Sequence, residues 1–400
     1  MKKHIVFITL ILSSYILAGQ KPVDFLMKGK ALLEAAKADE AVNILTEGLK
    51  QFNSSDIYLE RADAYLKKGD YSDAISDFNS ANNLDPGSGE YGLARIYGIK
   101  GDVKTAVYHL ESNLKSVYKK SEKDIMLDPA FGAIENTPEW RQFLQKDWYG
   151  NYERGMADIE YNISTGNIED AKTVLSGLAG NYPGNDDNIY AGALINVAEK
   201  KYQEAVKSLS GLLSEKPDNE KYLRLLAKAQ ENGGNPAGAS VTYTKLINLG
   251  IPDAGLLMSR AECYRRTGET GKAVDDIGRY LELYPDDKKA LSFAGKVESA
   301  AGDNIKALQY FSETLKLHPN DAECYIDRAN SYFLSKSWNW AIKDYSMSLD
   351  LQPGNPEVWL NKGIALLNSG NVSDACHDFR MAFSLGNKKA TELISRNCIK

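Results

Sequence analysis

The apolar positions of this chain recur with helical spacing inside a longer period. An alanine returns at a constant interval between positions 171 and 375, and a large apolar residue follows four residues later in most copies. Spacings of three and four place apolar residues on one face of an α-helix. A small residue that recurs on this face indicates a neighbouring helix too close for a larger side chain. The recurring residues are Ala171, Ala205, Ala239, Ala273, Ala307, Ala341 and Ala375, and upstream the step loosens slightly through Ala41, Ala74 and Ala106.

Turn signals divide each period into two helices. A glycine stands five residues before most of the alanines, and glycine can end a helix in the left-handed conformation without strain. A capping residue often follows, and after Asp70, Asn167 and Asn371 an acid three residues further on predicts a capping box. A proline ends the second helix in most copies because it lacks the N–H that the helix needs. Each period is therefore predicted to be a helical hairpin, and the hairpins are expected to stack because one alone cannot bury its apolar face.

In residues and spacing, this unit resembles the tetratricopeptide repeat. The family pattern has a small residue at place eight, tyrosine at eleven, alanine at twenty, an aromatic residue at twenty-four and proline at thirty-two. In the copy that starts at residue 322, these are Ala329, Tyr332, Ala341, Tyr345 and Pro353. The resemblance implies an all-α fold, an α-solenoid in which about ten hairpins form a right-handed superhelix with a C-terminal capping helix. Ten copies fit, at about 22–54, 55–86, 87–120, 152–185, 186–219, 220–253, 254–287, 288–321, 322–355 and 356–389.

The N-terminal segment 1–19 has the layout of a secretory signal peptide. Two lysines precede an apolar run that begins at Ile5 and ends near Leu17, and the small residues Ala18 and Gly19 follow. The alternative is an uncleaved membrane anchor, but the run falls short of the ~20 residues that span a bilayer. We expect an exported protein without stable membrane insertion, and a bacterial periplasm is the expected location.

The period breaks between copies three and four, where an insert of nearly one further period separates Ala106 from Ala171. The prolines and aromatics of this insert, among them Phe131, Trp140 and Phe143, predict a short packed cap, and the alternative is an irregular loop. The predicted organisation is a signal peptide at 1–19, an N-terminal array of three repeats at 20–120, an insert or cap with a joint at 121–151, a C-terminal array of seven repeats at 152–389 and a capping helix at 390–400.

The four cysteines suggest one disulfide bond. Cys376 and Cys398 stand at similar distances on either side of the turn at Gly386, so they would face each other in an antiparallel helical hairpin. An exported protein permits the bond, and the alternative is two buried thiols. Cys263 and Cys324 lie in first helices two repeats apart, beyond the ~7 Å between Cα atoms that a disulfide can bridge. We expect no bond between them.

Catalytic and nucleotide-binding motifs are absent from the sequence, and its four histidines are scattered. The many acidic residues are more typical of solvated helix faces than of a catalytic pair. A net charge of −6 is unfavourable for binding nucleic acid, whose phosphates require clustered Lys and Arg. We therefore expect a protein that is not an enzyme, has no cofactor or metal and does not bind nucleic acid.

The resemblance implies that places two, five, nine and twelve of each first helix line a concave groove. In copies six to eight these places form a predicted basic stripe, for which the alternative is a solvated face. The best-known groove of the family uses a Lys, Asn and Arg set to hold a C-terminal carboxylate, and copy six departs from it. The stripe consists of Lys221, Arg224, Lys228, Arg265, Lys289 and Lys296, opposed by Glu231 and Glu262.

In copies nine and ten the same places are mostly apolar, which predicts a second binding region. The alternatives are that the superhelix closes over these residues or that the capping helix covers copy ten. They are Ile326, Asn330, Phe333, Leu360, Ile364 and Leu367.

The sequence thus predicts a non-enzymatic, exported scaffold or adaptor that holds one or more proteins or peptides on its concave surface. An acidic partner segment is expected at the basic stripe. One alternative is a regulatory or chaperone-like subunit of an envelope enzyme or of a secretion or assembly complex. Another is a helical-repeat RNA reader, against which the signal peptide and the acidic charge argue.

Overall fold

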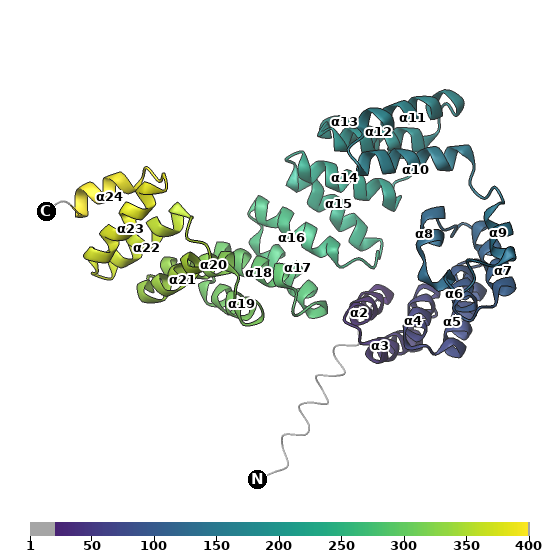
Figure 1. Cartoon of the computed structure of the whole chain (residues 1–400), viewed down its shortest axis with the longest axis horizontal. Coiled ribbons are helices and arrows are strands. Elements are labelled where there is room, and N and C mark those ends of the chain that lie inside the picture. The colour runs from purple at the N-terminus through teal and green to yellow at the C-terminus, as the bar shows by residue number, and fades with distance from the viewer. Residues whose placement is uncertain (1–20, 399–400) are drawn as a thin grey trace, which may run out of the picture. The chain divides into compact units, whose positions relative to one another are not determined.

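The computed structural model describes residues 21–398, and within this range it consists of α-helices, one short 3-10 helix and turns, with no β-strand (Figure 1). The all-α prediction is confirmed. The predicted signal peptide lies outside the described residues. Of the described helices, none is long and apolar enough to cross a membrane.

Twenty of the helices between residues 21 and 398 form ten consecutive pairs, and the two helices of a pair pack against each other in nearly all of them. The pairs are α2 (Pro22–Glu34) with α3 (Ala38–Gln51), α4 (Ser55–Lys68) with α5 (Tyr71–Leu84), α6 (Glu90–Ile99) with α7 (Val103–Leu114), α10 (Asn151–Ser164) with α11 (Ile168–Asn181), α12 (Asp186–Ala198) with α13 (Tyr202–Glu215), α14 (Glu220–Asn232) with α15 (Pro236–Asn248), α16 (Gly255–Thr267) with α17 (Thr270–Leu283), α18 (Lys288–Ala301) with α19 (Asn304–Leu317), α20 (Ala322–Leu334) with α21 (Trp338–Leu351) and α22 (Pro356–Asn368) with α23 (Val372–Ser384).

The described chain divides into two compact units. The first comprises residues 21–235 and 244–253, and the second comprises residues 236–243 and 254–398. Residues of α15 belong to both units. The division into two arrays at residues 121–151 stays a prediction.

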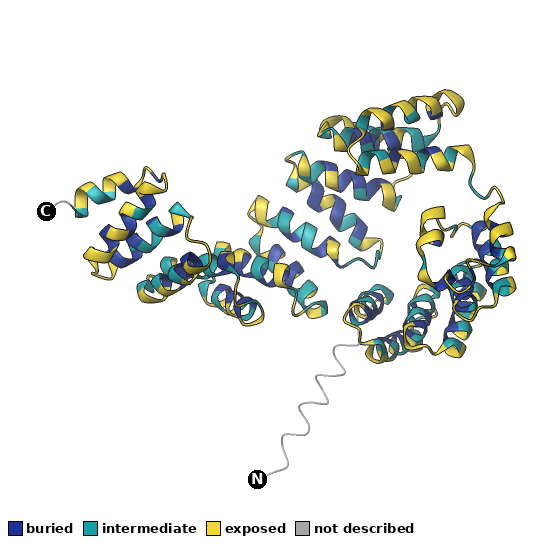
Figure 2. Ribbon diagram, viewed as in Figure 1, coloured by how far each residue is buried: buried dark blue, intermediate teal, exposed yellow. Residues whose placement is uncertain are grey.

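Small residues set how closely the helices of each pair approach. All ten recurring alanines, from Ala41 to Ala375, are fully buried. On the first helix the small residue at place eight lies against the large residue at place twenty-four of the second helix. A Cβ atom on Gly295 would lie 2.5 Å from the ring of Phe311, and one on Gly363 would lie 2.6 Å from the ring of Phe379. Figure 2 shows the result as buried faces where neighbouring helices meet.

The turn inside each pair keeps one backbone conformation even where glycine is missing. Seven copies have glycine with positive φ at this position, as in Gly302, where φ is 86°. The other three copies place Ala36, Lys200 and Lys336 there, with φ of 58°, 62° and 56°. A residue with a Cβ is disfavoured in this region, so packing of the two helices determines the turn.

The capping boxes predicted at Asp70 and Asn167 are wrong. Neither side chain accepts a hydrogen bond from the first turn of its helix. Asp70 forms an ion pair with Lys68 at 3.0 Å, and Asn167 donates a hydrogen bond to the Thr165 hydroxyl at 3.2 Å. Asn371 does cap its helix, because its Oδ1 accepts from the backbone N–H of Asp374 at 3.3 Å.

Buried ion pairs that were not predicted from the sequence connect the two helices of four copies. A basic residue at place seven of the first helix reaches a buried aspartate sixteen residues later. In copy nine, the guanidinium of Arg328 donates to both carboxylate oxygens of Asp344 at 2.7 and 2.9 Å. Since a buried charge is costly without a partner, each pair constrains how its two helices dock. The pairs are Arg61–Asp77, Arg260–Asp276, Arg328–Asp344 and Lys362–Asp378.

The insert contains α8 (Glu122–Leu127), the 3-10 helix η1 (Pro129–Phe131) and α9 (Pro138–Leu144). Its aromatic side chains form a core with apolar residues of α6 and α7. Phe131 stacks on Trp140 with ring centroids 5.1 Å apart, and Trp140 lies 5.4 Å from Phe143. All three rings are buried, so the insert packs as a cap on the third pair.

The C-terminal helix α24 (Ala390–Asn397) packs on the last pair. Its residues Leu393 and Ile394 belong to the same apolar cluster as Leu360. The sulfur atoms of Cys376 and Cys398 lie at disulfide distance, with the Cα atoms 5.6 Å apart, which is within the range for a disulfide.

We expect Ala307→Leu to destabilise the protein, because Ala307 is fully buried where α19 meets its neighbour. Overpacking at such a site costs about 1–3 kcal/mol. Gln309→Leu on the exposed side of the same helix is the matched control. Thermal unfolding followed by circular dichroism measures both variants, and equal shifts in Tm would show that the assigned helix face is wrong.

Candidate partner-binding groove

The structure pairs four of the six cations of the predicted basic stripe with carboxylates. Arg224 contacts Glu220 and Asp253, each at 2.7 Å. Arg265 contacts Glu262 at 2.7 Å. The other two paired cations are Lys221, which lies 4.0 Å from Asp187, and Lys296, which lies 2.9 Å from Glu323 and 3.2 Å from Asp327.

Lys228 and Lys289 are exposed and form no ion pair within residues 21–398. Lys228 lies on α14 in the first unit, and Lys289 lies on α18 in the second. The pairing of their neighbours removes most of the excess positive charge that the stripe was expected to present. Binding of an acidic segment at these residues stays a prediction.

The apolar residues predicted for copies nine and ten take part in packing. Ile326 and Phe333 are half-buried, and the ring of Phe333 meets the ring of Trp338 edge-on at 5.1 Å. Asn330 accepts a hydrogen bond from the buried Tyr345 hydroxyl at 2.6 Å. In copy ten the residues Leu360, Ile364 and Leu367 share a cluster with α24, as the alternative interpretation expected.

A hollow lies in the first unit, where the first helices of copies one to three line a cavity of about 390 Å³. Places nine and thirteen of α2, α4 and α6 supply six of its residues, and leucines at place twelve supply an apolar wall. Place nine was predicted to face the groove, but the predicted binding regions covered only copies six to ten. The lining residues are Lys30, Leu33, Glu34, Glu60, Asp63, Leu66, Lys67, Arg95 and Ile99.

The charges around this cavity are incompletely paired. Arg95 contacts Asp63 at 3.2 Å and Asp128 at 3.0 Å. The Nζ of Lys67 donates to the backbone carbonyl of Leu33 at 3.3 Å. Lys30 lies 4.0 Å from the carboxylate of Glu60, which is a loose contact. Charged groups of both signs are therefore available beside apolar side chains.

Burial raises the pKa of two carboxyls that line the cavity, Glu60 and Asp63. The side chain of Glu60 is 16% exposed, and burial raises its pKa from the ordinary value of 4.5 to about 7. The nearby Asp63 and Glu34 also raise the pKa, while Lys30 and Lys67 lower it. A cationic group from a partner would favour the charged form of Glu60.

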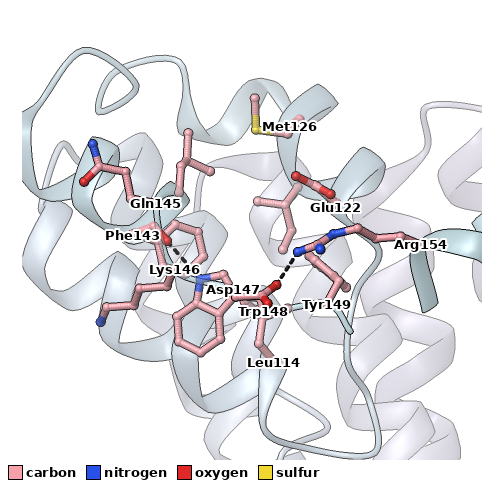
Figure 3. Close-up of a pocket in the computed structure, with 12 residues that line it drawn as sticks. Leu114, Glu122, Met126, Phe143, Gln145, Lys146, Asp147, Trp148, Tyr149 and Arg154 are labelled. Carbon is pink, nitrogen blue, oxygen red and sulfur yellow. Dashed lines mark hydrogen bonds and ion pairs between the residues drawn. The ribbon is translucent and has the colours of Figure 1, made fainter. Parts of the chain in front are cut away.

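A second hollow of about 200 Å³ lies at the insert. Figure 3 shows Glu122 and Met126 from α8, Phe143 from α9 and Arg154 from α10 around it. The indole N–H of Trp148 donates to the Phe143 carbonyl at 2.9 Å, which fixes one wall. Its lining combines apolar side chains such as Leu114 and Phe143 with charged ones such as Glu122 and Arg154.

The end of the insert, where the predicted joint of segment 121–151 lies, is bonded to the residues that precede the insert. Lys119 donates to the carbonyl of Trp148 at 2.8 Å and contacts Glu153 at 2.7 Å. The Tyr149 hydroxyl donates to the carbonyl of Lys120 at 2.7 Å. These bonds connect residues 119–120, at the end of copy three, with the end of the insert and with Glu153 in the first turn of α10. In the described part of the chain, no group of three or more His, Cys, Asp or Glu residues is arranged to hold a metal ion.

Comparison with known proteins gives short sequence matches and a broad structural one. A family model described as tetratricopeptide repeat matches residues 26–88. Hsp70-Hsp90 organizing protein 1 of Glycine max is 32% identical over 85 residues, which are 21% of this chain and 15% of that protein. Protein CTR9 homolog of Arabidopsis thaliana is 34% identical over 61 residues, 15% of this chain and 6% of that protein. The matches therefore span only a small part of either relative.

Among solved structures, the C-terminal part of a TPR repeat-containing protein from Cytophaga hutchinsonii is similar in fold. The TM-score is 0.51 at 15% sequence identity, and the match covers 59% of this chain and 98% of that one. The likeness concerns the arrangement of helices.

We expect Glu60→Gln to remove a pH dependence of stability. The folded carboxyl keeps its proton up to about pH 7, whereas the unfolded one releases it near 4.5. Protonated Glu60 therefore favours the folded state at low pH, and this contribution is lost as the pH rises through 7. Between pH 5 and pH 8, the free energy of unfolding of the wild type should therefore fall by about 2 kcal/mol more than that of the variant.

Urea unfolding at the two pH values measures this difference, with Glu40→Gln, at an exposed position of α3 outside the cavity lining, as the control. If the stability of the wild type and that of Glu60→Gln change equally with pH, the pKa of Glu60 is not raised in the folded protein.

Proposed function

Because the chain is a tetratricopeptide repeat protein, we propose that it is a non-enzymatic scaffold or adaptor whose grooves hold segments of protein partners. The observation that carries this proposal is the cavity between α2, α4 and α6, to which three successive repeats contribute equivalent residues. We assign the main partner contact to this cavity.

The lining of the cavity suits a peptide that carries both charged and apolar side chains. Lys30 and Lys67 can pair with acidic groups, and Glu60 can pair with a basic one. Leu33, Leu66 and Ile99 offer apolar contacts between these charges. Such alternation favours recognition of a specific segment, because a mismatched charge at an interface costs several kcal/mol.

Two further observations support a role in holding proteins and a location outside the cytoplasm. For the role, the relative from Glycine max is named as an organizing protein for Hsp70 and Hsp90. For the location, segment 1–19 has the composition of a secretory signal peptide. We therefore place the scaffold in the periplasm, where a regulatory or chaperone-like role in an envelope complex is the alternative use of the same groove.

Site-specific photo-cross-linking in the native cells tests the proposal. A benzophenone amino acid replaces Ile99, which lines the cavity and is 40% exposed. A second variant carries it at Lys228, on the predicted basic stripe. The control carries it at Tyr108 on α7, which is 66% exposed and lies outside the cavity.

The proposal predicts a discrete cross-linked partner at position 99 and none at position 108. A partner at position 228 alone would move the binding site to the stripe, and equal products at all three positions would contradict groove binding.

A further inference from the structure

The turn between α20 and α21 exposes large apolar side chains. Leu334, the last residue of α20, is 64% exposed, and Trp340 in the first turn of α21 is 57% exposed. Both residues belong to the second unit, and in the sequence they are far from the residues that line the cavity described above. Neither side chain belongs to the apolar cluster that forms the core of copy nine.

The aromatic rings at this turn are held in place. Trp340 stacks on Tyr332 with ring centroids 5.9 Å apart, and Trp338 meets Phe333 edge-on at 5.1 Å. Contact with Tyr332 thus restricts the orientation of the exposed Trp340 ring. Because the ring is already ordered, its binding to another surface costs little conformational entropy.

The neighbouring turns of the second unit continue the pattern. Ile305, in the first turn of α19, is 73% exposed, and Val372, at the start of α23, is 45% exposed. Consecutive hairpins pack side by side, with α19 against α20 and α21 against α22. The equivalent turns of three successive pairs therefore follow one edge, which we call the turn edge: Ile305, Leu334, Trp340 and Val372.

Two lysines of copy nine add positive charge to the turn edge. Lys336 lies in the turn itself, and Lys343 lies over the Trp340 ring with its Nζ 5.5 Å from the centroid. Neither forms an ion pair with any described residue, although the chain as a whole has a net charge of −6. Positive charge therefore lies beside the exposed ring of Trp340 in copy nine.

We propose that the turn edge rests on the surface of an anionic lipid bilayer, with Leu334 and Trp340 in the headgroup layer. Tryptophan rings favour this layer because they are apolar with one polar N–H. Lysines next to them are attracted to anionic lipids. Buried apolar area and attraction to anionic lipids together hold a protein at the membrane interface without any spanning helix. The proposal goes beyond partner binding in the groove and does not depend on it.

Fluorescence quenching by brominated lipid tests the proposal on the full chain. The vesicles contain phosphatidylglycerol and phosphatidylcholine with brominated acyl chains, which quench tryptophans that contact the bilayer. Comparing wild type with Trp340→Phe isolates the signal of this one ring, even if another segment also binds lipid. Leu334→Ser combined with Trp340→Ser tests affinity, with Val117→Ser and Tyr108→Ser, both at exposed positions of the first unit, as the matched control.

We expect the Trp340 signal to be quenched by the anionic vesicles and much less by vesicles of phosphatidylcholine alone. The Leu334 and Trp340 double variant should bind the anionic vesicles roughly tenfold more weakly or worse, because burial of large apolar side chains is lost. The control variant should bind as the wild type does. An unquenched Trp340 signal in vesicle-bound protein would overturn the proposal, as would a double variant with unchanged affinity. A turn edge that cross-links to a protein partner while its tryptophan stays unquenched would assign it to protein binding instead.

Discussion

The close approach of the two helices in each pair is the constraint on which the rest of the structure depends. It needs a small residue at place eight of the first helix or place twenty of the second, and all ten alanines at the latter place are fully buried. With that spacing, a large residue such as Phe311 can reach across to the first helix and meet Gly295. Each pair then offers an apolar face to the next pair, so burial accumulates through neighbour contacts alone.

The same constraint explains the features that vary between copies. Lys200 and Lys336 adopt a backbone conformation that favours glycine. They do so because the packed helices on either side fix the two ends that the short turn must connect. The buried pairs such as Arg260–Asp276 occur only in some copies, so they reinforce a geometry that the alanines already determine.

Much of the fold could be predicted from the sequence because a periodic fold repeats its packing pattern. The helix pairs and the alanine crossings follow from positions one period apart. Which charged side chains of the groove form ion pairs could not be predicted in the same way. Arg224 pairs with Asp253, which lies in the turn before the next copy. Whether such an acid reaches the groove depends on turn geometry that the period does not describe.

The candidate site was missed for a related reason. The cavity of copies one to three combines residues that are individually ordinary, and only their position on three neighbouring first helices brings Lys30, Asp63 and Arg95 together. The apolar positions of copy ten were easy to recognise, yet α24 covers them. Packing at the end of a stack differs from packing within it, so the last copy is a poor guide to the groove.

Each pair should therefore depend mainly on its immediate neighbours. Hydrogen exchange measured by mass spectrometry on an Ala74→Leu variant tests this most directly, since Ala74 is fully buried in α5 of the first unit. We expect faster exchange in α4 and α5 and in the adjoining helices α3 and α6, with α18 to α21 of the second unit unchanged. Faster exchange of equal size throughout both units, or no change in α4 and α5, would contradict this dependence on neighbours.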